Sequence, residues 1–142
     1  MEKVFTFYLE ESLFGIDINR VKEINRHVEF TPVPGSKPFV KGLFNMRGQV
    51  VTLFDLGKIL GYQVDKRETG RNACVILKAA ANDPNQVGFL IDRPGDVVEL
   101  DPAECELPPA NVGGIDGEYI ASIAKLQGKL LIIIRSERIF KI

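Results

Sequence analysis

A gapless internal repeat constrains the fold of this chain more than any other feature of its sequence. Residues 39–60 align with residues 119–140 without an insertion, so that apolar positions match apolar positions and Gly48 matches Gly128. Each copy has the pattern of a strand, a glycine turn, a second strand and a short apolar tail. Two copies of one hairpin predict two β units of similar structure.

A weaker repeat precedes each copy and extends the same prediction. The segment Gly15 to Ile18 resembles Gly88 to Ile91, and Val21 to Ile24 resembles Val97 to Leu100, with a register that differs by three residues between the two pairs. Strand patterns separated by turn residues fill most of the chain, which favours barrels or a sandwich over a parallel α/β sheet. We therefore predict an all-β protein of two units with roughly five strands each.

Only short segments depart from the strand pattern. Leu56 to Leu60, ended by Gly61, and Lys37 to Val40 predict short helical turns, and Val21 to Asn25 fits a helix as well as a strand. Asn82 to Asn85 is a strong turn signal, Gln63 to Asn72 reads as a loop, and Gly113 to Glu118 reads as a mobile linker. No Gly/Ser-rich or Pro-rich linker separates the halves, so residues 1–142 are expected to form one two-lobed domain.

Composition and charge argue against several classes of function. The net charge is −1, from 18 basic and 19 acidic residues that are mixed along the chain, and no basic stripe predicts contact with nucleic acid. The longest aliphatic run, Leu130 to Ile134, is far shorter than the roughly 20 residues that span a bilayer, and the first residues do not resemble a secretory signal. Cys74 and Cys105 stand apart and are expected to be reduced thiols. We therefore predict a cytoplasmic protein.

The chain also lacks the patterns of catalytic and cofactor sites. His27 is the only histidine and has no partner at the spacing of metal ligands, and Pro34 to Pro38 lacks the spacing of a phosphate-binding loop. We expect no catalytic residue, no metal and no cofactor. An enzyme or a small-ligand carrier that uses a groove between the lobes remains a less favoured alternative.

The stretch from Phe14 to Leu60 carries a family signature. It contains F-G-I-D-I-N-R-V-K-E-I, followed by P-V-P, F-V-K-G, N-M-R-G and D-L in that order, and the second half continues with V-G-F-L-I-D and V-V-E-L. This closely resembles the CheW family, the bacterial adaptors that couple chemoreceptors to the histidine kinase CheA. The resemblance spans essentially the whole chain, which favours a free-standing adaptor over a piece of the kinase.

The resemblance implies two SH3-like five-stranded β-barrels packed together. It also implies that a groove between them receives the helical tip of a chemoreceptor, and that other faces contact the regulatory domain of the kinase, with a monomer or weak self-association. Carried over by position, the residues that face the receptor are Ile18, Val21, Glu23, Ile24 and Arg47. An adaptor of the same fold in another receptor–kinase pathway, such as surface motility or development, remains an alternative.

Physical roles for these residues can be argued separately. Ile18, Val21 and Ile24 provide either an apolar strip for a docked helix or ordinary core. Arg47 can clamp carbonyl or carboxylate groups, with Glu23 as its expected partner within the protein or across an interface; the alternative is an exposed turn charge. The glycines of this region, expected to serve tight backbone geometry near the interface, are Gly42, Gly48 and Gly88.

Three positions depart from the pattern of the family. Met46 stands where leucine is usual, which conserves volume. Arg135 stands where aspartate is common, and Ile91 to Gly95 reads as a rigid turn in place of an aliphatic contribution to the groove. The last two differences affect the second lobe.

Overall fold

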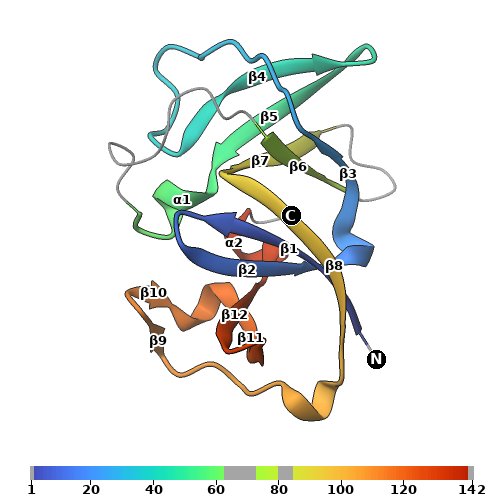
Figure 1. Cartoon of the computed structure of the whole chain (residues 1–142). Coiled ribbons are helices and arrows are strands. Elements are labelled where there is room, and N and C mark those ends of the chain that lie inside the picture. The colour runs from blue at the N-terminus through green and yellow to red at the C-terminus, as the bar shows by residue number, and fades with distance from the viewer. Residues whose placement is uncertain (1, 63–72, 80–84, 141–142) are drawn as a thin grey trace. The chain divides into compact units, whose positions relative to one another are not determined.

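The computed structural model describes residues 2–62, 73–79 and 85–140 (Figure 1). Contacts within the chain divide it into two compact units. Unit 1 combines Met1–Arg20 with Arg93–Ile142, and unit 2 is Val21–Asp92. In chain order, unit 2 is therefore inserted between two segments of unit 1.

Unit 1 contains a five-stranded sheet with the strand order β11-β12-β2-β1-β8. Neighbouring strands are antiparallel, except that β12 and β2 run parallel. The strands are β1 (Glu2–Leu9), β2 (Ser12–Asp17), β8 (Arg93–Leu100), β11 (Ile120–Leu126) and β12 (Lys129–Ile134). A small ribbon and four short helices complete the described part of unit 1: β9 (Asn111–Val112), β10 (Ile115–Asp116), α2 (Ser136–Ile139) and the 3-10 helices η1 (Ile18–Arg20), η3 (Pro102–Glu104) and η4 (Gly117–Tyr119).

Unit 2 contains a second five-stranded sheet, with the strand order β3-β6-β7-β5-β4. Its neighbours are antiparallel, except for the parallel pair β5 and β7. The elements are β3 (Val21–Asn25), β4 (Val40–Met46), β5 (Gln49–Asp55), α1 (Leu56–Ile59), β6 (Ala73–Leu77) and β7 (Gln86–Ile91). The chain is thus all-β with two five-stranded sheets, as the sequence predicts, and the ambiguous segment Val21–Asn25 is a strand.

The two sheets share one pattern of pairing. Leu53 lies opposite Gly88 in the parallel pair β5–β7, and Ile133 lies opposite Gly15 in the parallel pair β12–β2. The hairpin repeat and the glycine repeat, found separately in the sequence, therefore meet in space at the same place in each sheet. At both sites an added Cβ would press on the neighbouring strands, which is a reason for glycine there.

The weaker repeat has a different register from the one that the sequence suggests. Val75 lies opposite Ile24 in the pair β6–β3, and Phe5 lies opposite Val97 in the pair β1–β8. Ile24 therefore corresponds to Val97, whereas the sequence comparison sets it against Leu100. Gly15 and Gly88 are separated in the sequence by the same number of residues as Ile24 and Val97. The predicted three-residue change of register between the two pairs of segments is therefore wrong. An irregularity in each ladder breaks the alternation on which the sequence comparison depends.

Buried strand side chains build a core in each unit, with alternating burial along β4 and β5 and continuous burial along β6. In unit 2, the inward side chains of β4 and β5 pack with those of β6 around Leu53 and Ile76, which are fully buried. In unit 1, Leu131 and Ile133 pack against Val4 of β1. Burying an aliphatic side chain of this size contributes roughly 1.5–3 kcal/mol, so these layers supply much of the driving force for folding.

The helical segments are single turns. The turn predicted after residue 55 is α1, whose N-cap Asp55 accepts a 3.1 Å hydrogen bond from the Lys58 amide. The segment Lys37 to Val40 forms a turn, closed by a 2.9 Å bond from the Val40 amide to the Lys37 carbonyl, and contains no helix. Pro38 explains this, because the residue before proline disfavours the helical conformation.

Two expectations about irregular segments are wrong. The predicted rigid turn from Ile91 to Gly95 is mostly strand, since only Asp92 separates β7 from β8. The predicted linker from Gly113 to Glu118 is ordered structure, with β10 and the start of η4. The loop predicted at residues 63–72 and most of the turn predicted at residues 82–85 lie outside the described residues.

Candidate functional site

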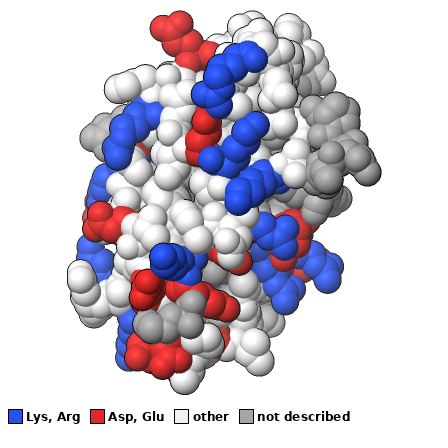
Figure 2. Space-filling view, turned by 90° about the vertical axis from the view of Figure 1, so that its right-hand side faces the viewer, with Lys and Arg blue, Asp and Glu red and all other residues white. Residues whose placement is uncertain are grey.

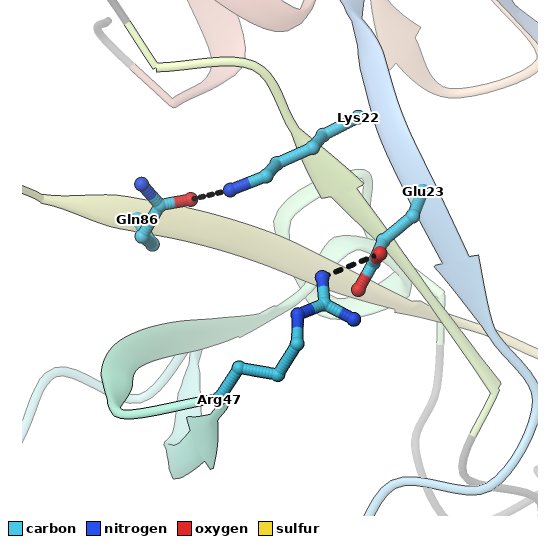
Figure 3. Close-up of polar contacts among 4 residues, drawn as sticks. All are labelled: Lys22, Glu23, Arg47 and Gln86. Carbon is cyan, nitrogen blue, oxygen red and sulfur yellow. Dashed lines mark hydrogen bonds and ion pairs between the residues drawn. The ribbon is translucent and has the colours of Figure 1, made fainter.

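Arg47 and Glu23 form an ion pair in unit 2 (Figure 3). The guanidinium Nη2 of Arg47 donates to the Glu23 carboxylate at 2.8 Å, which is the length of a charge-assisted hydrogen bond. Glu23 was expected to pair with Arg47 either within the protein or across an interface, and the contact within the protein is present. The Arg47 side chain is 70% exposed, so it remains accessible to solvent despite the ion pair.

The two partners come from opposite edges of one sheet. Glu23 lies on the edge strand β3, and Arg47 lies in the turn that joins the other edge strand, β4, to β5. An ion pair between the first and last strands requires a sheet that curls until its edges approach, as in a small barrel. The Arg47 backbone has a φ of +50°, and Gly48 follows at +85°, which is the geometry of a tight hairpin reversal.

A second polar contact lies beside this pair (Figure 3). The Lys22 ammonium is 3.5 Å from the side-chain oxygen of Gln86, which is a buried residue of β7. Lys22 and Glu23 are neighbours on β3, so the strand presents a cation and an anion side by side. Together with Arg47 they form a charged edge on unit 2.

Exposed apolar side chains flank the Arg47 turn. Val50 is 57% exposed and Leu43 is 36% exposed, although both lie in strands of the β4–β5 hairpin. Asn45 lies opposite Val50, and the Asn45 side chain accepts a 2.9 Å bond from the Gly48 amide. The hairpin thus carries a guanidinium at its tip and aliphatic side chains on its outer face, a combination that suits protein recognition. Leu43 and Val50 are not among the site residues expected from the sequence.

The comparisons with known proteins identify the family. The model of the CheW-like domain matches residues 3–142. The chain belongs to the CheW-like domain family. The chemotaxis protein CheW of Treponema pallidum is 30% identical over 141 residues, which cover 97% of this chain and 81% of that protein. The CheW of Thermotoga maritima is also 30% identical, over 139 residues that cover 98% of this chain and 87% of that protein.

A solved structure agrees with this assignment. The scaffolding protein TtCheW of Thermoanaerobacter tengcongensis superposes with a TM-score of 0.86 at 29% sequence identity. The match covers 99% of this chain and 88% of that chain. The fold of this chain is therefore that of a known CheW protein.

The residues carried over from the CheW family have different surroundings. Val21 is buried and contributes to the core, whereas Ile24 is partly exposed on β3. Ile18 is also partly exposed, but it lies in η1, which belongs to unit 1. Of the residues carried over in unit 2, Arg47 and Glu23 contact each other, and both side chains are at least partly exposed.

The glycines carried over from the CheW family have distinct local reasons. An added Cβ at Gly42 would overlap the carbonyl oxygen of Thr31, which bonds to the amide of Leu43. A Cβ added at Gly48 would meet no atom within 4 Å. Glycine is favoured there because the backbone has a positive φ. Gly88 is intermediate, with the Val75 carbonyl oxygen 3.1 Å from the ideal Cβ position.

The thiol of Cys74 is buried on β6, the strand that pairs with the Glu23 strand β3. Burial raises the pKa of Cys74 to about 12, and the negative charge of Glu23 adds to the increase, while a backbone hydrogen bond from Asn25 opposes it. Cys74 therefore stays a neutral thiol at neutral pH and has no nucleophilic character there. Cys105 is also free, and burial is the largest cause of its raised pKa.

Two other kinds of site are absent from residues 2–62, 73–79 and 85–140. Among them, no group of three or more His, Cys, Asp and Glu side chains is placed to hold a metal ion. Within the same residues, no helix has the length and apolar character needed to cross a membrane. The candidate site is consequently the Arg47–Glu23 edge of unit 2.

Proposed function

We propose that this chain is a cytoplasmic adaptor of bacterial chemotaxis, which joins the tip of a chemoreceptor to the regulatory domain of a CheA-type histidine kinase. It acts by binding and not by catalysis, without a metal or a cofactor. The membership of the CheW-like domain family supports this proposal, as do the names of its relatives, which are chemotaxis proteins, and of the structural neighbour, which is a scaffolding protein.

The observation that carries the receptor contact is the exposure of Arg47 despite its ion pair. Glu23 restrains the long arginine side chain, which reduces the conformational entropy that a binding partner must overcome. The remaining N–H donors can bind carbonyl or carboxylate groups of a receptor helix, and arginine is enriched at the energetic centres of interfaces. Ile24, Leu43 and Val50 supply apolar surface in unit 2 for the same partner.

A single contact of this size gives modest affinity. An exposed ion pair contributes roughly 0.2–1 kcal/mol, and a docked helix adds apolar contacts to it. Receptors that are clustered at high local concentration convert such contacts into strong overall binding. The adaptor therefore needs no extensive interface with each receptor molecule.

The decisive experiment measures receptor-dependent kinase activity with purified components. Arg47→Glu is expected to reduce activation more than tenfold, because it reverses the charge that faces the receptor. This variant also places two carboxylates side by side, so the double exchange Arg47→Glu with Glu23→Arg is tested in parallel. The exchange restores the internal ion pair but leaves the reversed charge at the turn, and activation is expected to stay low.

The matched control is Gln127→Glu, at the equivalent turn of unit 1. Activation by this control should remain near that of the wild type, and the circular dichroism spectrum should be unchanged in all variants. Full activation by the double exchange would show that the pair only stabilises the fold and would contradict the receptor contact. A pull-down with the protein identifies the cognate kinase and separates chemotaxis from surface motility or development.

A further inference from the structure

A second surface feature lies entirely in unit 1. A pocket of about 390 Å³ opens between the ends of β1, β2, β11 and β12 and the segment that follows η3. Its volume falls within the range of roughly 300–1,000 Å³ that is typical of binding pockets. Its apolar wall includes Ile16, Ile133 and Ile134, whose side chains are buried in the unit.

The rim of this pocket is strongly acidic. Glu2, Asp17, Glu106 and Glu137 all line it, and among the described residues of the lining Arg20 is the one basic side chain. Arg20 already lies 3.8 Å from Glu137, in an ion pair whose side chains are about half exposed. Figure 2 shows acidic side chains gathered at the lower end of the face it presents. Such a rim attracts a cationic group and repels an anionic one.

An apolar side chain stands at the same rim. Leu107 lines the pocket and is 88% exposed, the highest value among the large hydrophobic residues of the described chain. Pro108 and Pro109 follow it, so that the backbone from residue 107 onward is restricted. Before it, Glu106 exchanges backbone bonds of 2.8 Å and 2.9 Å with Ile123 of β11. Leu107 is therefore an exposed aliphatic side chain on a conformationally restricted backbone. Such a side chain suits an anchor for a partner, because less conformational entropy is lost on binding.

We propose that this pocket binds a basic, amphipathic segment of another protein. A lysine or arginine side chain of the partner enters among the carboxylates of Glu106, Asp17 and Glu2, and a neighbouring apolar side chain packs on Leu107. The acidic rim selects this occupant over an acidic segment, and the apolar wall with Leu107 selects it over a free cation. The proposal is independent of the Arg47 surface, which lies in unit 2.

The test uses the full-length protein and two labelled peptides. The probe is an eight-residue peptide in which Leu alternates with Lys and Arg, and its control has Glu at every basic position. Fluorescence anisotropy is expected to show binding of the basic peptide only, with an affinity that falls as salt is added. Amide signals in NMR spectra should shift for residues 105–107 and 121–122. Equal binding of both peptides, binding of neither, or shifts confined to other residues would overturn the proposal.

Variants then separate charge from packing. Glu106→Gln should weaken binding about threefold to fivefold, and Leu107→Ala about tenfold. Arg20→Gln should strengthen it, since it removes the competing cation and releases Glu137. Glu104→Gln, an exposed acid of the same segment outside the lining, is the matched control and should bind as the wild type does.

Two further measurements distinguish other occupants. Arg47→Glu should leave peptide binding unchanged, so that failure of the proposed receptor contact and failure of this pocket are told apart. Sedimentation of the wild type and of Leu107→Asp tests a second copy of the chain as the occupant. A concentration-dependent dimer that Leu107→Asp abolishes would mean that the pocket joins two copies, and it would overturn the proposal.

Discussion

Arg47 and Gln127 adopt the same left-handed backbone conformation, with φ of +50° and +51°, at the turns of the β4–β5 and β11–β12 hairpins. Each is followed by a glycine, and each lies at the same position of the sequence repeat. A residue other than glycine pays a conformational cost on the order of 1 kcal/mol in this region. The two turns are alike in backbone but differ in charge, and the Arg47 side chain forms an ion pair with Glu23 of another strand.

Replacing each of these residues with glycine separates backbone strain from side-chain function. Gln127→Gly is expected to raise the free energy of unfolding by about 0.5–1 kcal/mol, because glycine relieves the left-handed conformation. Arg47→Gly gains the same relief but loses the ion pair, so its stability should stay within about 0.5 kcal/mol of the wild type. Urea denaturation checks both values. A large loss of stability in Arg47→Gly would contradict a modest, exposed pair.

Gly42 is expected to be the least replaceable of the three glycines near the Arg47 surface. A methyl group there would overlap the Thr31 carbonyl and break the paired bonds of 2.8 Å and 2.9 Å between Thr31 and Leu43. Gly42→Ala should therefore cost more than about 2 kcal/mol. Gly88→Ala, where the nearest atom is 3.1 Å away, is the matched comparison and should cost less. Thermal melting of the two variants ranks them, and the reverse order would refute the argument.

The helices α1 and α2 differ in their N-cap residue. Asp55 caps α1 through the Lys58 amide, whereas Arg135, at the equivalent position before α2, makes no side-chain cap. Arg135→Asp should install the missing cap and raise the free energy of unfolding by about 0.5–1 kcal/mol. Asp55→Ala should lower it by about 1–2 kcal/mol. Chemical denaturation measures both changes, and destabilisation by Arg135→Asp would mean that the arginine has a contact more valuable than a cap.

The buried thiol predicts a specific alkaline sensitivity. The pKa of Cys74 rises from 9.0 to about 12 on folding, mainly through burial. Below about pH 9 the Cys74 thiol is protonated in the folded and in the unfolded chain, so its contribution to stability is fully present. Between about pH 9 and pH 12 the thiol loses its proton in the unfolded chain only. The free energy of unfolding should therefore fall by up to about 1.4 kcal/mol per pH unit in this range.

Comparison with Cys74→Ala isolates this contribution. The variant is expected to be less stable at neutral pH, since it loses buried volume, but its stability should fall less steeply above about pH 9. Urea unfolding at several alkaline pH values gives both slopes. Parallel slopes for the two proteins would mean that Cys74 does not titrate as its burial implies.

The hairpins could be predicted from the sequence because their signals are local. Gly48 and Gly128 mark the reversals, and the alternation of β-forming residues on each side marks the strands. The parallel pairs β5–β7 and β12–β2 were not predicted, because a strand pattern does not state which distant strand lies beside it. The insertion of unit 2 into unit 1 depends on those same long-range pairings.

The candidate site, too, could be predicted only in part from the sequence. The charge and the turn position of Arg47 made Glu23 its expected partner, although the sequence left open an internal contact and an intermolecular one. The exposure of Val50 and Leu43 was missed, because alternation defines two faces of a strand but does not say which face other elements cover. Turn proximity is a signal that could have pointed to Val50, which lies two residues after Gly48.

The insertion has a consequence for how the chain folds during its synthesis. Residues 21–92 contain all five strands of one sheet, so this segment can complete its hydrogen bonding soon after it leaves the ribosome. The strands β1 and β2 are made first, yet their neighbours β12 and β8 are translated only after that segment. The aromatic side chains of these strands, Phe5, Phe7 and Phe14, are buried in the folded unit, so their complete burial requires β8 and β12 and follows the synthesis of unit 2.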